Sequence, residues 1–215
     1  NAKENLDVLN QPFVVVELDN IKDHPIFFPI VTLITTSLFI SKMRKLQGVR
    51  KLIVIEEAWK AIAKGSMAEF MKYLYKTVRK HFGEAITVTQ EIDDLIGSPI
   101  VKETIINNAD CKIILDMKKF QNKFDAVQQV LGMTDKGRDL VLSINRANDP
   151  NYRYREIYTE PGNQLMKVYR FEPSPYEYYA YTTEQSEKVR VQEYAKKYGS
   201  IQKGLAAMVA DMKTN

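Results

Sequence analysis

The sequence predicts an α/β fold with a mainly parallel, doubly wound sheet, followed by a helical pair, a β-hairpin and closing helices. Short apolar runs recur at residues 13–18, 52–55, 85–89 and 112–115, and each is too short for a helix. Segments with helical spacing separate these runs, and the connections are short. This alternation is typical of parallel strands that are buried on both faces.

Composition sets limits on the class of protein. The 215 residues suffice for a full core, and a net charge of +4 permits contact with nucleic acid or an anionic membrane surface. One cysteine and two histidines exclude an internal disulfide and argue against a structural zinc site. Cys111 lies in an apolar run, so we expect it to be buried. Because the chain starts at Asn1 rather than at a methionine, we expect it to be part of a longer protein.

The first strand is expected at Phe13–Leu18, where a β-branched run ends at Asp19. The helix that follows begins between Asp23 and Pro29 and runs to about Leu46, with Gly48 as the stop. Its uncharged stretch, Ile26–Ile40, is shorter than the roughly 20 residues that span a bilayer. We therefore expect a buried helix rather than a membrane span.

The next strand, Leu52–Ile55, ends in two adjacent carboxylates, Glu56 and Glu57. Ligands bind at the carboxyl ends of strands in open α/β sheets. A nucleotide-hydrolysing site needs one carboxylate for magnesium and one to orient or deprotonate water. The pattern therefore fits a Walker B strand. The alternative is a strand that runs into a solvated turn, where glutamates are ordinary, and the rest of the chain has to decide.

The following elements continue the alternation. A capping box, Ser66–Glu69, opens a helix that ends at Gly83. A third strand, Ala85–Thr89, finishes at Gln90. A short helix then begins at Ser98-Pro99 and runs to about Asn107, ahead of the fourth strand at Lys112–Leu115.

From residue 122 the pattern changes. We expect two helices around Gly132, the second running from Thr134 to Ile144, and then two antiparallel helices around Gly199 at the end of the chain. Between these pairs the strands are expected at Tyr152–Tyr158, Leu165–Phe171 and Tyr176–Thr182, the first two as a hairpin. The predicted division is a core at 1–120, an appended helical pair and hairpin at 121–183, and C-terminal helices at 184–215.

A phosphate-cradling loop is missing from the sequence. The pattern G-x-x-x-x-G-K-[ST] occurs nowhere in the chain. Gly132–Gly137 and Gly199–Gly204 have the glycine spacing but lack the lysine and the hydroxyl, and we interpret both as turns between helices. If Glu56 and Glu57 form a Walker B pair, the Walker A loop is expected upstream of Asn1.

Four motifs appear in a fixed order: Ile55–Trp59, Thr77–Lys80 before a glycine, Val88–Gln90 at a strand end, and Ile106–Ala109 before the next strand. Together they resemble the TraG-type ATPases of conjugative transposons. These form the largest ATPase class of type IV secretion systems, within the HerA–FtsK group. The resemblance covers nearly the whole chain.

The resemblance implies a RecA-like P-loop NTPase core that assembles as a hexamer at the cytoplasmic face of the inner membrane, as a peripheral protein. It further implies ATP and Mg²⁺ as cofactors in the complete protein. The implied partners are other copies of the chain, the secretion-channel components, the coupling protein and DNA.

Residue roles carry over position by position. Glu56 takes the magnesium position, Glu57 the catalytic base and Gln90 the sensor of the γ-phosphate. The family usually has aspartate where this chain has Glu56, and the longer side chain favours a water-mediated contact to magnesium. Without the resemblance, an ordinary strand-end cap is the favoured interpretation of Gln90.

Three further residues match family motifs. Arg79 precedes the sensor strand and is a candidate arginine finger for a neighbouring subunit, although a cation at a helix C-terminus is the simpler interpretation of that position. Asn107 and Asn108 match a motif that we assign to cofactor binding.

Three functions remain open from the sequence. The first is the C-terminal motor portion of a conjugation ATPase, inactive without its upstream loop. The second is an interaction and assembly module of the secretion machinery that has no turnover of its own. The third is a DNA-translocating motor of the same superfamily. An upstream G-x-x-x-x-G-K-[ST] would favour a motor over the module.

Overall fold

The computed structural model describes residues 7–21, 23–56, 65–90, 105–149, 154–162 and 164–214. The chain forms two compact units. Unit 1 comprises Asn1–Asp110 and Phe120–Thr134, and unit 2 comprises Cys111–Lys119 and Asp135–Asn215.

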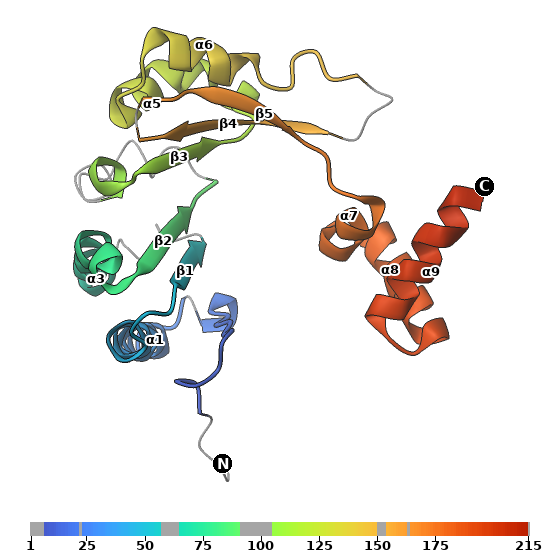
Figure 1. Ribbon diagram of the computed structural model, residues 1–215, viewed down its shortest axis with the longest axis horizontal. Coiled ribbons are helices and arrows are strands. Elements are labelled where there is room, and N and C mark those ends of the chain that lie inside the picture. Colours follow the sequence, from blue (N-terminus) through green and yellow to red (C-terminus); the bar gives the residue numbers. More distant parts are fainter. Residues whose placement is uncertain are drawn as a thin grey trace. The chain divides into compact units, whose positions relative to one another are not determined.

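Unit 1 is built on two parallel strands, β1 (Lys51–Glu56) and β2 (Gly83–Val88). Helices α1 (Phe27–Lys45) and α3 (Gly65–Thr77) pack with them (Figure 1). The core of the unit is apolar and includes Phe28, Met43, Phe70, Met71, Leu74, Val78 and Ile105. Ile53, Ile55 and Ala85 pack against this core, so one face of the strand pair is covered.

The turn from α3 into β2 explains why a glycine starts the strand. After η2 (Val78–His81), Phe82 adopts a left-handed conformation with φ 56°, and its N–H bonds to the carbonyl of Arg79 at 3.2 Å. A Cβ on Gly83 would lie 2.7 Å from Cγ2 of Val78, closer than two carbon atoms can approach. Only glycine lets β2 begin directly beneath the end of the helix.

The prediction of one four-stranded parallel sheet is wrong for two of its strands. Residues 52–55 and 85–88 pair in parallel as expected, but residues 13–18 form no strand, and Phe13 is 82% exposed. The run at 112–115 belongs to β3 (Cys111–Ile114), which pairs antiparallel with the hairpin. An apolar, β-branched run needs a neighbouring backbone to pair with, and local composition does not specify which strand supplies it.

Helix α1 forms as predicted but is not the buried helix that was expected. Phe28, Thr32 and Met43 are buried, whereas Ile30, Leu33 and Ile34 are exposed. The helix is apolar on all sides, so packing one side on α3 leaves the other side open. Length and composition alone would let α1 cross a membrane, and 22% of its apolar window is buried.

Unit 2 contains an antiparallel sheet in the order β3-β4-β5, with β4 at Arg155–Pro161 and β5 at Lys167–Phe171. The predicted hairpin is therefore confirmed. Helix α6 (Asp135–Ser143) packs against β5. Cys111 is exposed rather than buried, because it stands at the first position of β3 on a face with little cover.

The chain then passes from β5 into three helices: α7 (Pro175–Tyr181), α8 (Gln185–Tyr198) and α9 (Ile201–Thr214) (Figure 1). The last two confirm the predicted closing pair. The strand expected at Tyr176–Thr182 is wrong. Ser174 and Glu177 form a capping box: the Ser174 hydroxyl accepts from the N–H of Glu177, and the Glu177 carboxylate accepts from the N–H of Ser174. Pro175 occupies the first turn, so the segment is helical.

Two predicted glycine turns also need correction. Gly132 and Gly199 do end helices in the left-handed conformation. However, Gly137 lies inside α6 and Gly204 inside α9. A Cβ on Gly204 would lie 2.6 Å from the backbone nitrogen of Ala195, so this glycine permits α8 and α9 to approach closely. The remaining short elements are η1 (Asp19–Ile21), η4 (Ile106–Asn108), η5 (Lys118–Lys123) and α5 (Phe124–Leu131).

Candidate functional site

The carboxyl ends of β1 and β2 bring two of the predicted site residues to one edge of the strand pair. Glu56 is the last residue of β1 and is paired in register with Val88, the last residue of β2. Gln90 follows two residues later, about 7 Å further along the strand direction. Both side chains are exposed. The expected adjacency of the two strands is confirmed, while Glu57 and Trp59 lie outside the described residues.

The two faces of the strand pair give these ends different surroundings. Side chains alternate along a strand, so Glu56 shares the open face with Leu52 and Val54, which are exposed. Thr87 lies on the covered face and its hydroxyl is 2.7 Å from the hydroxyl of Tyr75 in α3. Burial raises the pKa of Tyr75, so this hydroxyl stays neutral and keeps its hydrogen bond. This hydrogen bond holds β2 against α3 at Thr87, one residue before the end of the strand.

Arg79 lies at the opposite edge from Glu56. It belongs to η2, which leads into the first residue of β2, whereas Glu56 stands level with the last. The strands are six residues long, which separates the two edges by about 17 Å. Within one chain, Arg79 therefore cannot contact the same phosphate group that Glu56 contacts.

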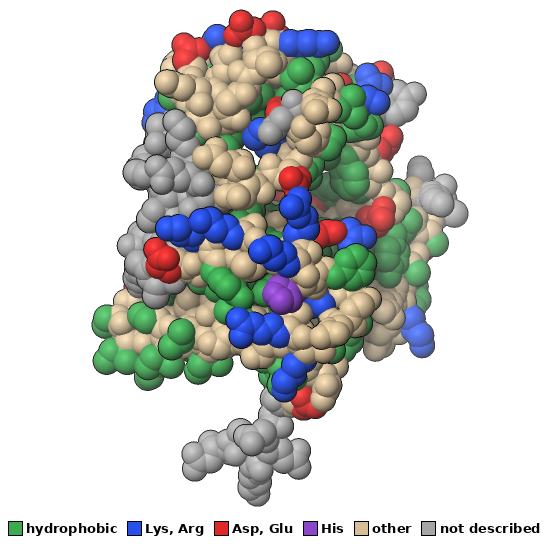
Figure 2. Space-filling model, turned by 60° about the vertical axis from the view of Figure 1, so that its left-hand side comes forward, with side chains coloured by type: hydrophobic (Ala, Val, Ile, Leu, Met, Phe, Trp, Pro, Cys, Tyr) green, Lys and Arg blue, Asp and Glu red, His purple; other side chains and the backbone are tan. Residues whose placement is uncertain are grey.

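Arg79 belongs to a basic surface made by the ends of α1 and α3 and by η2. The exposed cations are Arg44, Lys45, Arg50, Lys76, Arg79 and Lys80. Figure 2 shows Lys and Arg side chains gathered on the side of the molecule where α1 and α3 lie. Arg44 donates to the hydroxyl of Tyr73 at 3.1 Å and thereby lowers the pKa of Tyr73. In the part of the chain described, neither Arg79 nor Lys80 forms an ion pair, so both remain available to an anionic partner.

Asn107 and Asn108 occupy a different kind of position. Both lie in η4, which comes before β3 rather than after a strand. The neighbouring Ile105 is buried in the core of unit 1, and Ile106 packs against that core. The core thus fixes the backbone of η4, and both asparagine side chains are exposed. Asn107 and Asn108 therefore do not follow the carboxyl end of a parallel strand, as Gln90 does.

The described residues fit one part of a magnesium–nucleotide site. They include no group of three or more His, Cys, Asp or Glu side chains able to hold a metal ion alone. Magnesium commonly binds through one or two carboxylates together with phosphate oxygens and water, so Glu56 suffices as a protein ligand only when a phosphate is present. Gln90 can donate to or accept from a phosphate or a water at the same edge. Glu56 and Gln90 suit the part of a nucleotide site that holds magnesium and water. The phosphate-binding loop of such a site does not occur in the sequence.

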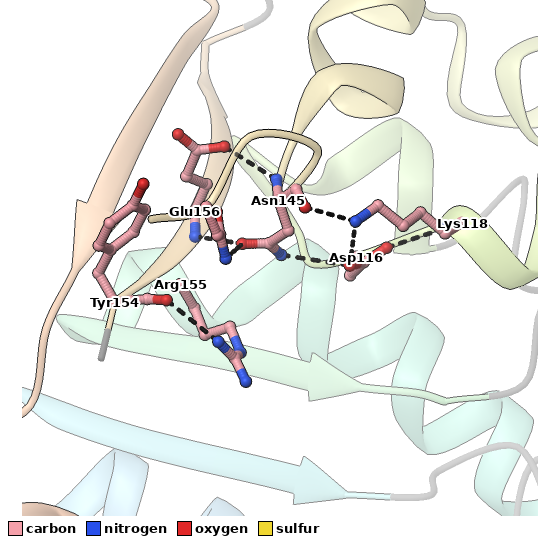
Figure 3. Close-up of polar contacts among 7 residues, drawn as sticks. Asp116, Lys118, Asn145, Tyr154, Arg155 and Glu156 are labelled. Carbon is pink, nitrogen blue, oxygen red and sulfur yellow. Dashed lines mark hydrogen bonds and ion pairs between the residues drawn. The ribbon is translucent and has the colours of Figure 1, made fainter. Parts of the chain in front are cut away.

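A second polar cluster, in unit 2, was not found from the sequence. Asn145 has φ 57°, and its backbone N–H donates to Glu156 at 2.8 Å while its side-chain oxygen accepts from the N–H of Glu156 at 2.9 Å. Its amide donates to Asp116 at 3.3 Å, and its carbonyl accepts from Lys118 (Figure 3). The members bond to one another, which indicates a structural role. The available signal was an asparagine just after a helix, a position that favours left-handed backbone.

The comparisons with known proteins agree with the motifs. The TraG P-loop domain family matches residues 1–212. The chain is 27% identical over 119 residues to the type IV secretion system protein CagE of Helicobacter pylori, covering 53% of this chain and 12% of that protein. It is 32% identical over 88 residues to protein TraC of Escherichia coli, covering 38% of this chain and 10% of that protein.

A solved structure supports the fold. The structure of VirB4 of Thermoanaerobacter pseudethanolicus superposes with a TM-score of 0.52 at 16% identity, covering 74% of this chain and 41% of that one. The chain covers only 12% of CagE and 10% of TraC, a small part of each of these relatives. Because the family match extends over almost all of its residues, the chain belongs to the TraG P-loop domain family.

Proposed function

We propose that this chain is the hydrolytic half of the nucleotide site of a type IV secretion ATPase. The observation that carries the proposal is the register of β1 and β2, which puts Glu56 and Gln90 at one edge of a parallel pair. Parallel strands bind ligands at this edge. Membership of a P-loop family and the likeness to CagE and TraC support the same conclusion.

Each residue of the proposed site has a distinct task. Glu56 holds magnesium, directly or through a water, and its extra methylene relative to aspartate favours the longer, water-mediated route. Glu57 orients the attacking water and accepts its proton. Gln90 hydrogen-bonds near the terminal phosphate. Bound magnesium neutralises charge that develops on the phosphate oxygens during transfer.

The cradle for ATP comes from a Walker A loop elsewhere in the complete protein, because this sequence has none. The backbone amides and lysine of such a loop supply most of the nucleotide contacts. On this proposal the chain alone binds ATP weakly and does not turn it over. Binding and chemistry thus belong to different stretches of one protein.

Arg79 acts on a neighbouring copy in this proposal. Its place at the opposite edge from Glu56 means that one chain cannot present both to the same phosphate. A head-to-tail contact brings one copy's basic edge to the next copy's carboxyl edge, and repetition of such a contact closes a ring. We propose that the ring is a hexamer. We also propose that Asn107 and Asn108 contribute to nucleotide binding.

The cellular setting follows from the relatives. One relative is named as a component of a type IV secretion system, so we propose the same machinery for this chain, with channel components and the coupling protein as partners. We place it as a peripheral protein at the cytoplasmic face of the inner membrane, coupling hydrolysis to conjugative DNA transfer or channel assembly. DNA is a further partner.

One observation favours a second function. The open face of β1 and β2 and the outer side of α1 expose apolar side chains, among them Leu52, Val54, Ile30 and Leu33. Large exposed apolar surfaces mark sites of protein contact. An assembly module without turnover would need these surfaces and no catalytic base.

Two carboxamide substitutions in the complete protein separate these functions. Glu57→Gln is expected to preserve affinity for magnesium-ATP and to lower kcat by about 10²- to 10⁴-fold, because the amide keeps the shape but cannot accept a proton. Glu56→Gln is expected to weaken magnesium-dependent binding. Glu84→Gln serves as the matched control, since Glu84 is an exposed carboxylate of β2 at the opposite edge. Hydrolysis that survives in Glu57→Gln, or turnover by this chain alone, would put the site elsewhere.

A further inference from the structure

A groove in unit 2 lies where the chain leaves β5 and enters α7 and α8. Its volume is about 390 Å³. This falls at the lower end of the range for small-ligand pockets. The groove is lined by Phe171, Pro173, Glu177, Tyr178, Tyr181, Thr182, Thr183 and Glu184. These residues include aromatic rings and carboxylates but no lysine or arginine.

The aromatic walls are exposed to an unusual degree. Tyr181 is 81% exposed and Phe171 is 55% exposed, although both are large apolar side chains. Tyr178 lies deeper and packs edge-on against the buried Tyr179, with ring centroids 5.1 Å apart. Its hydroxyl donates to Glu187 at 3.2 Å, which fixes the ring. The groove therefore offers ring surfaces that the described chain leaves open.

Two carboxylates at the groove are held in place by backbone caps. One oxygen of Glu177 accepts from the N–H of Ser174 at 2.9 Å, and one oxygen of Glu184 accepts from the N–H of Glu187 at 2.9 Å. Neither carboxylate forms an ion pair among the described residues.

The protonation state of these carboxylates suits a cation. The hydroxyl of Ser174 and its backbone N–H lower the pKa of Glu177. The hydroxyl of Ser186 and the N–H of Glu187 lower the pKa of Glu184. Each group is therefore ionised at neutral pH.

We propose that this groove binds an arginine side chain presented by a positively charged segment of a partner protein. A guanidinium donates in a planar fork to a carboxylate and stacks on an aromatic face with the same plane, so it uses both features of the groove together. Two carboxylates without a neighbouring cation repel a phosphate group, which excludes nucleic acid and anionic lipid as occupants. The apolar surfaces of Phe171 and Pro173 accept the aliphatic stem of the side chain.

A labelled short peptide that carries several arginines tests the proposal against the whole chain, with fluorescence anisotropy as the readout. The matched probe is the same peptide with citrulline at each arginine, which keeps the shape and removes the charge. We expect the citrulline peptide to bind at least about tenfold more weakly, because charge-assisted hydrogen bonds are lost. The affinity of the arginine peptide is expected to fall as salt is raised.

Substitutions locate the binding to the groove. The double variant Glu177→Gln with Glu184→Gln keeps an oxygen for each helix cap and is expected to weaken the arginine peptide about tenfold or more. Tyr181→Ser is expected to weaken it independently, and its 81% exposure makes the substitution safe for folding. The controls are Glu193→Gln on α8 and Tyr176→Ser on α7, which change the same residue types outside the groove lining.

Unchanged thermal midpoints show that the variants fold. The proposal is overturned if the citrulline peptide binds as tightly as the arginine peptide. It is equally overturned if Tyr181→Ser binds no more weakly than Tyr176→Ser. The groove lies in unit 2 and takes no part in the proposed hydrolysis. If arginine binding at the groove is disproved, the proposed nucleotide site still stands, and if the nucleotide site is disproved, the groove proposal still stands.

Discussion

The polar residues of the two units differ in where their hydrogen bonds go. In unit 1, the side chains of Glu56 and Gln90 are exposed at a strand end and form no hydrogen bond or ion pair among the described residues. In unit 2, Asn145 and Glu156 bond reciprocally. Side chains that are saturated inside the chain hold the fold, whereas side chains left open at a strand end are suited to a ligand. Substitutions at Glu56 and Gln90 should therefore be tested for activity, and substitutions at Asn145 and Glu156 for stability.

The largest expected effect concerns the open cation at the edge of unit 1. Arg79→Ala in the complete protein is expected to lower hydrolysis by about 10³- to 10⁵-fold, the range for an arginine finger, while nucleotide affinity stays nearly unchanged. Steady-state turnover and equilibrium binding measure the two quantities. Subunits with Arg79→Ala are expected to regain activity when mixed with subunits defective only in Glu57. An absence of such rescue would mean that Arg79 does not act between copies.

The next effect concerns the most buried ion pair described in unit 2. Lys112 and Glu160 form a 3.2 Å ion pair with side chains only 11% and 6% exposed, and Glu160 also accepts from the hydroxyl of Tyr158 at 2.6 Å. Desolvation and the adjacent Glu160 carboxylate raise the pKa of Tyr158, so this hydroxyl remains the donor at every ordinary pH. Glu160→Leu is expected to destabilise the chain by about 3–5 kcal/mol, because the largely buried Lys112 loses the carboxylate of its ion pair.

Denaturant unfolding measures this cost. The informative comparison is the double variant Lys112→Met with Glu160→Leu, which removes both charges. It is expected to be more stable than Glu160→Leu alone, since a buried pair replaced by apolar side chains costs less than a broken one. Equal stability of the single and double variants would show that the pair is not desolvated.

A smaller effect is expected at Asn145. Asn145→Ala removes the side-chain hydrogen bonds to Glu156 and Asp116 and puts alanine at φ 57°, so we expect a loss of about 2–3 kcal/mol. Asn145→Gly loses the same bonds but adopts this φ without strain, and is expected to be about 1 kcal/mol more stable than the alanine variant. If alanine is tolerated as well as glycine, the left-handed backbone is not a constraint on this turn.

The smallest effect is expected at an exposed pair of unit 1. Arg50 and Glu84 form an ion pair with side chains 70% and 49% exposed. Arg50→Ala should change stability by less than about 1 kcal/mol, because solvent and salt screen such a pair. It should also leave hydrolysis intact, which makes it the matched control for Arg79→Ala on the same basic surface. A large loss in either quantity would erase the distinction between the two arginines.

Local signals in the sequence predicted the elements better than their partners. The runs at 52–55 and 112–115 have similar apolar character, yet one pairs in parallel and the other antiparallel. The choice depends on which distant backbone lies alongside, and composition does not encode that directly. By contrast, helix α7 was predictable, because Ser174 and Glu177 have capping-box spacing that the strand interpretation overlooked.

The candidate site divides in the same way. Glu56 and Gln90 were predicted because a polar residue after an apolar run is a local signal, and the structure pairs the two strands in parallel. The cluster around Asn145 escaped because its partners, Asp116 and Glu156, are distant in the sequence and become neighbours only in the folded unit. A periodic pattern of hydrophobic residues in the sequence does not reveal such a polar cluster.

The central claim is that a nucleotide-bound metal sits at the carboxyl ends of β1 and β2, and iron-directed cleavage tests it most directly. In the complete protein, Fe²⁺ in place of Mg²⁺ generates hydroxyl radicals that cut the backbone near the metal. With ATP, ascorbate and peroxide, we expect cuts close to Glu56 and Gln90, which disappear when excess Mg²⁺ competes. Cuts near Arg50 and Glu84, about 13–20 Å away at the other end of the strands, would contradict the claim, as would cuts confined to Asp116 and Glu156.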